Sequence, residues 1–112
     1  MIAVIFEVMP KPGRAQEYFD RAAQLKAELE HVDGFISVER FASLSTEGKF
    51  LSLSIWRDEA AVRTWRENSN HRAAQRAGRG GIFADYRLRI ASVFREYGMF
   101  DRTGAPIDTS FA

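Results

Sequence analysis

The sequence contains no cysteine, which excludes disulfide bonds, thiolate metal sites and a cysteine nucleophile. It has only two histidines, His31 and His71, and they form no H-x-x-x-H or H-x-x-E-H pair, so no metal site is predicted. The formal net charge of +1 does not favour a nucleic-acid or membrane-surface binder. Long apolar runs are also missing, because Pro10 ends the N-terminal run before it reaches the length of a signal peptide or a membrane span. We therefore expect a soluble protein of the cytoplasm.

What is present is typical of one globular domain. The chain has 112 residues, of which 46% are hydrophobic and 28% charged, and this size and balance fit a single hydrophobic core. Periodicity persists to about residue 98, and the remainder is rich in Gly, Pro, Thr and Asp. We expect a folded domain over residues 1–98 and an irregular tail over 99–112, which contacts the domain through Phe100 or Phe111.

Apolar periodicity along the chain predicts alternating strands and helices. Positions 2–9 are apolar on both faces of a strand, and residues 14–30 carry one apolar helical stripe. Asp58 is well placed as the N-cap of a second helix, which the run "ENSN" interrupts. The remaining expected elements are strands over 35–41, 49–56 and 83–97, a short helix over 71–77 and a glycine loop over 78–81.

This order, β-α-β-β-α-β, is that of the ferredoxin-like α+β fold with a four-stranded antiparallel sheet. Both helices should cover one face of the sheet and leave the other open. The alternation places Phe35, Phe41, Phe50 and Trp56 on one side of their strands, but it does not say which side meets the helices. Apolar side chains remain on the open face in either case. We expect a two-fold homodimer that packs sheet against sheet, with coverage by the tail as the alternative.

Several stretches resemble a known family. The segments "GFISVERF", "LSLSIWRDEAAVRTWRENSNHRAAQRAGR" and "FADYRLRIASVFREYG" are similar to the antibiotic biosynthesis monooxygenase (ABM) domain over roughly residues 1–98. The passage W-R-D-E-A-A…W…H resembles the family's strand-to-helix pattern most closely. The resemblance implies a dimeric α+β barrel with a cavity between the helices and the sheet. Members of the family include cofactor-independent monooxygenases acting on polyketide phenols and anthrones, quinol oxidases and haem-degrading proteins.

Trp65 and His71 are the candidate catalytic residues. The resemblance implies that Trp65 faces the cavity and stacks on a flat substrate; the alternative is a core tryptophan that anchors its helix. The interruption of the helix can aim His71 inward, where a neutral imidazole could remove a phenolic proton; the alternative is a surface or capping histidine. Asn68 and Asn70 are the candidate donors of hydrogen bonds to a substrate carbonyl. His31 is assigned no role.

Two further residues are candidate substrate contacts. Phe6 stands where the haem-degrading branch of the family has an asparagine, and Gln75 stands where that branch has its haem-ligating histidine. These departures weaken a haem function. Arg76 shares a helix face with Arg72, and the pair could hold an anionic substrate group or simply form a solvated face.

Three functions remain open from the sequence. The first is a cofactor-independent monooxygenase that oxidises an electron-rich aromatic molecule (a phenol, anthrone or quinol) with O2. The second is a non-catalytic dimeric binding or stress-related module of the same fold, since a fold alone does not confer activity. The third, less favoured, is haem binding or degradation. In each case the partner is a small molecule and a second copy of the chain.

Overall fold

The computed structural model describes residues 1–68, 72–73, 76 and 78–107. Its elements, in chain order, are β1 (Ile2–Pro10), α1 (Ala15–Leu29), β2 (Phe35–Ala42), β3 (Phe50–Trp56), α2 (Glu59–Arg66), the helical turn η1 (Gly78–Ile82) and β4 (Phe83–Ser92). This is the predicted β-α-β-β-α-β order, and the ferredoxin-like fold is confirmed.

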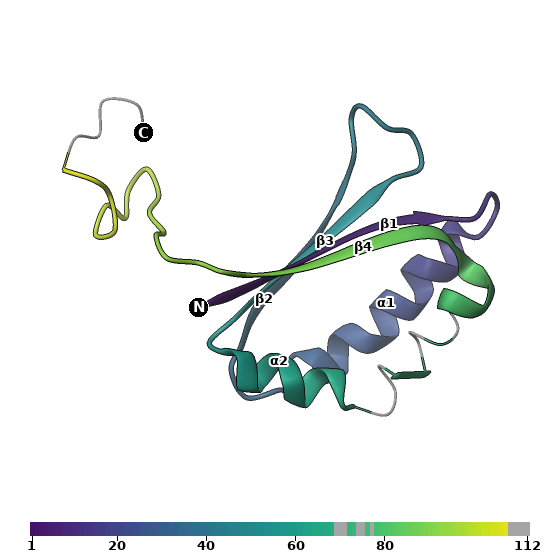
Figure 1. Ribbon diagram of the computed structural model, residues 1–112, viewed down its shortest axis with the longest axis horizontal. Helices are drawn as coiled ribbons and strands as arrows, with labels where there is room; N and C mark the ends of the chain where they lie inside the picture. The colour runs from purple at the N-terminus through teal and green to yellow at the C-terminus, as the bar shows by residue number, and fades with distance from the viewer. Residues whose placement is uncertain (69–71, 74–75, 77, 108–112) are drawn as a thin grey trace.

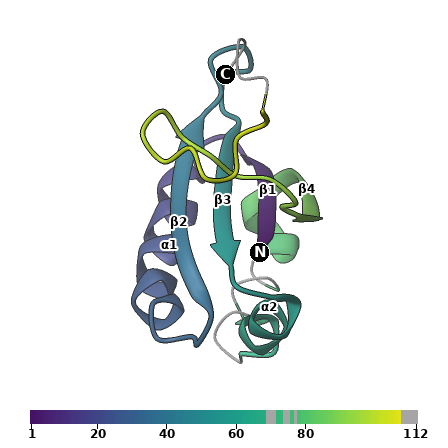
Figure 2. The same cartoon turned by 90° about the vertical axis from the view of Figure 1, so that its left-hand side faces the viewer.

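The four strands form one antiparallel sheet in the order β2-β3-β1-β4. The apolar β1 lies inside the sheet between β3 and β4, which fits its lack of a polar face. Both helices lie on one side of the sheet, and no described helix covers the other side (Figures 1 and 2). We call the side toward the helices the inner face and the opposite side the outer face.

Strand alternation decides which residues belong to each face. Val4 and Phe6 of β1 lie on the inner face together with Ser52 and Ser54 of β3, their paired residues in the register. The outer face carries the intervening apolar residues Ala3, Ile5, Leu51, Leu53 and Ile55. The helices therefore pack against the side of the sheet that holds Phe50 and Trp56. The sequence alone did not say which side this would be.

A β-bulge in β2 overturns one prediction about the faces. Phe35 pairs with Trp56 and Ser37 pairs with Ile55, so Ile36 is an extra residue that shifts the alternation. Phe35 packs against Trp56 on the inner face, with ring centroids 5.4 Å apart. Phe41, which pairs with Leu51, lies on the outer face and is exposed. The expectation that Phe35 and Phe41 share a side was therefore wrong.

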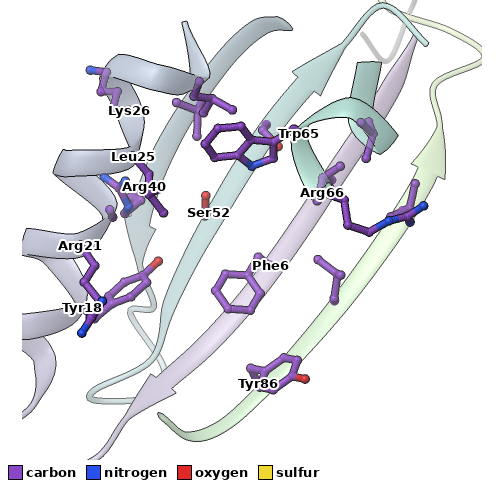
Figure 3. Close-up of a pocket in the computed structure, with 18 of the residues that line it drawn as sticks. Phe6, Tyr18, Arg21, Leu25, Lys26, Arg40, Ser52, Trp65, Arg66 and Tyr86 are labelled. Carbon is purple, nitrogen blue, oxygen red and sulfur yellow. The ribbon is translucent and has the colours of Figure 1, made fainter. Parts of the chain in front are cut away.

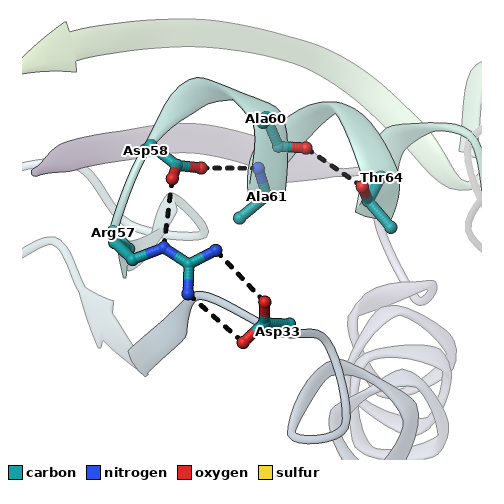
Figure 4. Close-up of polar contacts among 6 residues, drawn as sticks. All are labelled: Asp33, Arg57, Asp58, Ala60, Ala61 and Thr64. Atoms are coloured by element: carbon teal, nitrogen blue, oxygen red, sulfur yellow. Dashed lines mark hydrogen bonds and ion pairs between the residues drawn. The ribbon is translucent and has the colours of Figure 1, made fainter.

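Helix α2 begins as predicted. The carboxylate of Asp58 accepts a hydrogen bond from the backbone N–H of Ala61 at 2.9 Å, which satisfies one of the donors that every helix leaves open at its N-terminus (Figure 4). This cap fixes the start of the helix, and the side chains of Ala61, Val62 and Trp65 then form its buried stripe.

The segment between α2 and β4 is described only in part. Residues 72–73 and 76 are helical, in agreement with the helix predicted over 71–77. Residues 78–82 form the short turn η1, in which the backbone of Gly81 is not helical (φ 170°, ψ −16°). Two donors hold this turn: the N–H of Lys11 bonds to the carbonyl of Ile82 at 2.8 Å, and Arg14 Nη1 bonds to the carbonyl of Gly81 at 3.2 Å. The helix expected over 71–77 lies partly outside the described residues.

Strand β4 ends at Ser92, five residues before the predicted end at Tyr97. Ser92 pairs with Ile2, the first residue of β1, and Val93 makes one further bond to the carbonyl of Met1 at 3.0 Å. Beyond this point the described chain leaves the sheet without a neighbouring strand (Figure 1). Phe100 is 92% exposed and so does not dock on the domain as expected; Phe111 lies outside the described residues.

None of the helices in the described part of the chain is both long and apolar enough to cross a membrane.

Candidate active site

A cavity of about 410 Å³ lies between the two helices and the inner face of the sheet. It separates two buried clusters. One contains Leu29, Trp56, Ala61, Val62 and Trp65, and the other contains Val8, Tyr18 and Ile82. Because these clusters pack at opposite ends of the layer, the middle of the layer is left open. The volume is within the range that holds small organic ligands.

Trp65 forms part of the cavity wall on the α2 side (Figure 3). Its side chain is 9% exposed and packs with Trp56 and Val62. The position depends on the Asp58 cap, because the helix start sets which later residues point inward. The two environments considered for the indole therefore both apply: it packs in the core, and it lines the cavity.

Phe6 lies on the floor of the cavity, in the middle of β1. Its ring centroid is 5.8 Å from that of Phe83 and 5.8 Å from that of Tyr86, both on β4. Tyr18 of α1 meets Phe83 edge to face at 5.8 Å. These tilted ring contacts are the geometry that aromatic side chains prefer, and they give the cavity an aromatic side suited to a flat apolar molecule.

The polar lining is cationic and not acidic. Arg21 and Lys26 of α1, Arg40 of β2 and Arg66 of α2 all contribute to the wall (Figure 3). None of the described lining residues is an aspartate, glutamate or histidine. The cavity therefore favours a neutral or anionic occupant over a cation.

Tyr18 and Arg40 interact at one side of the cavity. Tyr18 is 6% exposed, and its burial raises the pKa of its hydroxyl; the nearby charge of Arg40 offsets part of this rise. Tyr18 therefore stays a neutral phenol at physiological pH. Arg40 reaches the inner face because it pairs with Ser52 across the β2–β3 ladder.

The other predicted site residues do not join this group in the described structure. Asn68 follows α2 and is half-buried, but it is not among the lining residues. Arg76 is exposed and also outside the lining. Asn70 and His71 lie outside the described residues, so the position of the candidate base stays a prediction.

Sequence reasoning missed Tyr18 and Arg40. Tyr18 belongs to the apolar stripe of the first helix. The pattern predicts a core residue there, because most of the side chain is an apolar ring and only the hydroxyl is polar. Arg40 carried a usable signal: it stands two residues after Val38 and so shares its face of the strand. A charged side chain at an inward-facing position of a strand that packs against a helix indicates a functional site.

No group of three potential metal ligands from histidine, cysteine, aspartate or glutamate occurs among residues 1–68, 72–73, 76 and 78–107. The described lining contains no histidine, cysteine or methionine; its tyrosines, Tyr18 and Tyr86, are of a type that ligates haem iron in some proteins. The described lining therefore gives no specific support for a haem site.

The sequence model of one family, Antibiotic biosynthesis monooxygenase (ABM), matches residues 1–77, which is more than half of the chain. The chain belongs to the antibiotic biosynthesis monooxygenase family. The resemblance drawn from the sequence is therefore confirmed. Residues 1–77 include β1, both helices and the β2–β3 hairpin, and so most of the elements around the ABM cavity.

A jasmonate monooxygenase ABM of Pyricularia oryzae is 46% identical to this ABM chain over 93 residues. The match covers 83% of the chain but 43% of that protein, so the chain spans less than half the length of this relative.

Solved structures support the ABM fold. Rv0793 of Mycobacterium tuberculosis matches with a TM-score of 0.77 at 15% identity, covering 87% of this chain and 98% of that one. SnoaB of Streptomyces nogalater, a cofactor-independent oxygenase solved as a point mutant, matches with a TM-score of 0.72 at 13% identity, covering 85% and 94%. At such identities the likeness establishes the shared fold.

Proposed function

We propose that the chain is a cofactor-independent monooxygenase that oxidises a flat, electron-rich aromatic molecule with O2. The observation that carries the proposal is the cavity: about 410 Å³, with aromatic rings on one side, Trp65 in its wall and cations in place of carboxylates. Membership of the ABM family and the cofactor-independent reaction named for SnoaB support it.

The chemistry suits a substrate that supplies its own electrons. An anthrone-type ring loses a proton to give a delocalised anion, which transfers electrons to O2. One oxygen atom becomes the new carbonyl oxygen, and the other leaves as water with the two hydrogens of the oxidised carbon. The substrate gives up four electrons and O2 accepts four, so no flavin, metal or reductant is needed. The cationic lining stabilises the anion, and the apolar walls keep water away from it.

Trp65 and His71 keep their proposed roles in this scheme. The indole of Trp65 stacks on the substrate and orients it, and the imidazole of His71 removes the proton. Asn68 and Asn70 are proposed to hydrogen-bond the carbonyl, Phe6 to contact the ring, and Arg76 to hold an acidic substituent. Of these, Trp65 and Phe6 have the strongest support, since both line the cavity.

Oxygen uptake with a panel of anthrones, naphthols, quinols and jasmonate tests the proposal. We expect turnover of at least one anthrone or naphthol, and a fall of about 10- to 100-fold in kcat/KM for Trp65→Phe, which removes the indole stacking surface and its donor. Arg63→Gln, on the exposed side of the same helix, is the matched control and should retain full activity. Jasmonate enters the panel because of the substrate named for the 46% identical relative.

A second candidate function rests on one observation: no described lining residue is a carboxylate or histidine that could act as a general base. This favours a non-catalytic module that binds the same aromatic molecules. Absence of oxygen uptake with every panel member, combined with saturable binding of a naphthol in the cavity, would select this function over the oxygenase.

We also propose that the chain acts as a homodimer. The outer face exposes or half-exposes the apolar residues Ile5, Phe41, Leu51, Leu53 and Ile55 with no described helix over them. A second copy packed sheet against sheet would remove this surface from water. Sedimentation equilibrium at micromolar concentration measures the state directly.

A further inference from the structure

One side of the cavity concentrates hydrogen-bond donors. Tyr18 and Arg21 come from α1, Arg40 from β2 and Ser52 from β3, and Figure 3 shows these four side chains gathered on the same side of the cavity. We call Tyr18, Arg40 and Ser52 the donor corner. Arg40 and Ser52 are direct partners in the β2–β3 ladder, so their side chains leave the sheet next to each other.

The charge at the donor corner has no carboxylate partner in the described structure. The ion pairs among described residues join Arg14 to Glu17, Lys49 and Arg89 to Glu7, and Arg57 to Asp33 and Asp58. Arg40 is in none of them, although its side chain is half-buried against an apolar cavity. A cation in such a place has lost part of its hydration without gaining a counter-charge, and an anion in the cavity would supply one.

Arg40 lies close enough to Tyr18 for its charge to act on the tyrosine hydroxyl. A guanidinium has five N–H donors and no acceptor, so Arg40 can only donate hydrogen bonds. The phenolic O–H of Tyr18 and the hydroxyl of Ser52 are further donors. The corner therefore presents several donors to one region of the cavity. A planar oxyanion can accept from several donors at once, whereas a carbonyl or an ether oxygen can use fewer of them.

The rest of the wall defines the body of the ligand. Phe6, Phe83 and Tyr86 form an aromatic side, and Trp65 of α2 also lines the cavity. We propose that the donor corner binds a carboxylate group, and that the cavity takes an aromatic acid whose flat ring lies against Phe6 and Trp65. The inference rests on the proposed function only in calling this ligand the substrate; the binding site itself does not depend on turnover.

A matched pair of probes isolates the carboxylate. 2-Naphthoate and 2-naphthamide have nearly the same shape, but only the first carries a negative charge at pH 7. By calorimetric titration of the wild-type protein, we expect naphthoate to bind about tenfold or more tightly than naphthamide. Arg40→Gln should remove this preference by weakening naphthoate binding while naphthamide binding changes less than about threefold. Tyr18→Phe should weaken naphthoate binding several-fold, because it loses the O–H donor and keeps the ring.

Two control variants separate local from general effects. Arg63→Gln removes the same charge from an exposed position outside the cavity and should leave both affinities unchanged. Arg40→Lys keeps the charge but loses the planar fork of donors, and should recover only part of the preference. Naphthamide binding serves as the check that each variant still has an intact cavity.

Three outcomes would overturn the inference: equal affinities of the wild type for the two probes, an unchanged naphthoate affinity in Arg40→Gln, or no naphthoate binding at millimolar concentration. A failure of the oxygenase proposal looks different. Oxygen uptake would then be absent with every panel member while the preference for naphthoate, and its loss in Arg40→Gln, remained.

Discussion

Arg57 holds Asp33 through both terminal nitrogens of its guanidinium, with Nη1–Oδ1 and Nη2–Oδ2 distances of 3.2 Å each (Figure 4). Its Nε donates to Asp58 Oδ2 at 3.0 Å, and its backbone N–H donates to the carbonyl of Gly34 at 2.7 Å. The loop before β2 is thereby tied to the first residues of α2. Surface ion pairs of this kind contribute little to stability. Their consequence here is the direction of α2, and with it the position of Trp65.

The close approach of this loop to α2 requires glycine at position 34. Gly34 has φ +92°, and a Cβ built on it would stand 2.7 Å from Ala61 Cβ and 3.2 Å from Arg57 Cζ. We expect Gly34→Ala to lower the free energy of unfolding by about 2–4 kcal/mol, combining left-handed backbone strain with overpacking.

Gly48→Ala is the matched control in urea denaturation. Gly48 also has a positive φ, +78°, but a Cβ there meets nothing within 4 Å. Backbone strain alone should cost about 1 kcal/mol. Equal losses of unfolding free energy in the two variants would show that the close contact between position 34 and α2 makes no additional contribution to stability.

The two carboxylates around Arg57 predict a loss of stability in acid. The hydrogen bond from Arg57 lowers the pKa of Asp33, and the N–H of Ala61, followed by Arg57, lowers the pKa of Asp58. A carboxyl whose folded pKa is lowered adds stability above its unfolded pKa, about 3.9, and loses it as the pH falls through the folded value. The free energy of unfolding should therefore fall as the pH drops from about 5 to about 2.

Two variants separate these carboxylates in pH-dependent urea denaturation. Arg57→Gln should remove the contribution of Asp33 to the loss of stability in acid. It should keep most of the contribution of Asp58, because the Ala61 N–H still binds that carboxylate. Asp58→Asn should remove the contribution of Asp58 to the pH dependence of stability, while the asparagine can still cap the helix. An acid slope unchanged in both variants would assign the pH dependence to other groups.

The strand and helix order was predictable because it depends on local periodicity, and the N-cap because Asp58 precedes an apolar helical stripe. The bulge at Ile36 was not, since an inserted residue leaves no mark in the composition of β2. The end of β4 at Ser92 depends on the length of its partner β1 and not on the residues that follow, which still alternate.

The cavity itself was implied by the family resemblance and not by periodicity. Apolar residues on a helix stripe predict burial, but they do not reveal whether facing side chains fill the layer or leave a space. Trp65 and Phe6 were found because they stand at positions of a family pattern. Tyr18 and Arg40 are brought together by α1 and β2, a relationship that requires the tertiary structure.

Tyr18 should ionise at an unusually high pH. Its burial raises the pKa of its hydroxyl above the ordinary value of about 10, with Arg40 offsetting part of the rise. Absorbance at 295 nm, taken as the difference between wild type and Tyr18→Phe, should give a midpoint above pH 10. Because the raised pKa favours the protonated folded form, this contribution to stability is present below pH 10 and is lost as the pH rises through the folded pKa. A midpoint at or below 10 would contradict burial of the hydroxyl.

The outer face predicts a charge-sensitive dimer. Leu53 lies on β3 beside Ile5 and Glu39 in the register, within the apolar surface proposed to meet a second copy. Leu53→Glu should weaken self-association about 100-fold or more, because each copy would bury an unpaired carboxylate in the proposed interface. Thr64→Glu, on the exposed side of α2, adds the same charge away from the sheet and should leave the sedimentation profile unchanged. A wild type that sediments as a monomer at all concentrations would remove the proposal.

Filling the cavity should impair function without unfolding the protein. Ser52 lies on the inner face in the middle of β3 and lines the cavity, so Ser52→Phe would place a ring where the ligand is proposed to bind. Since the cavity of about 410 Å³ can accept the added ring, the free energy of unfolding should change by less than about 2 kcal/mol. We expect kcat/KM for oxygen uptake to fall at least about tenfold and naphthamide affinity to fall in parallel, because the ring excludes every ligand whatever its charge.

Ser45→Phe, in the exposed β2–β3 loop, makes the same substitution outside the cavity and should change neither quantity. The pair distinguishes exclusion from the charge effect of Arg40→Gln, which spares the neutral probe. If Ser52→Phe folds and still binds naphthamide with the affinity of the wild type, the ligand does not occupy the space between Trp65 and the sheet.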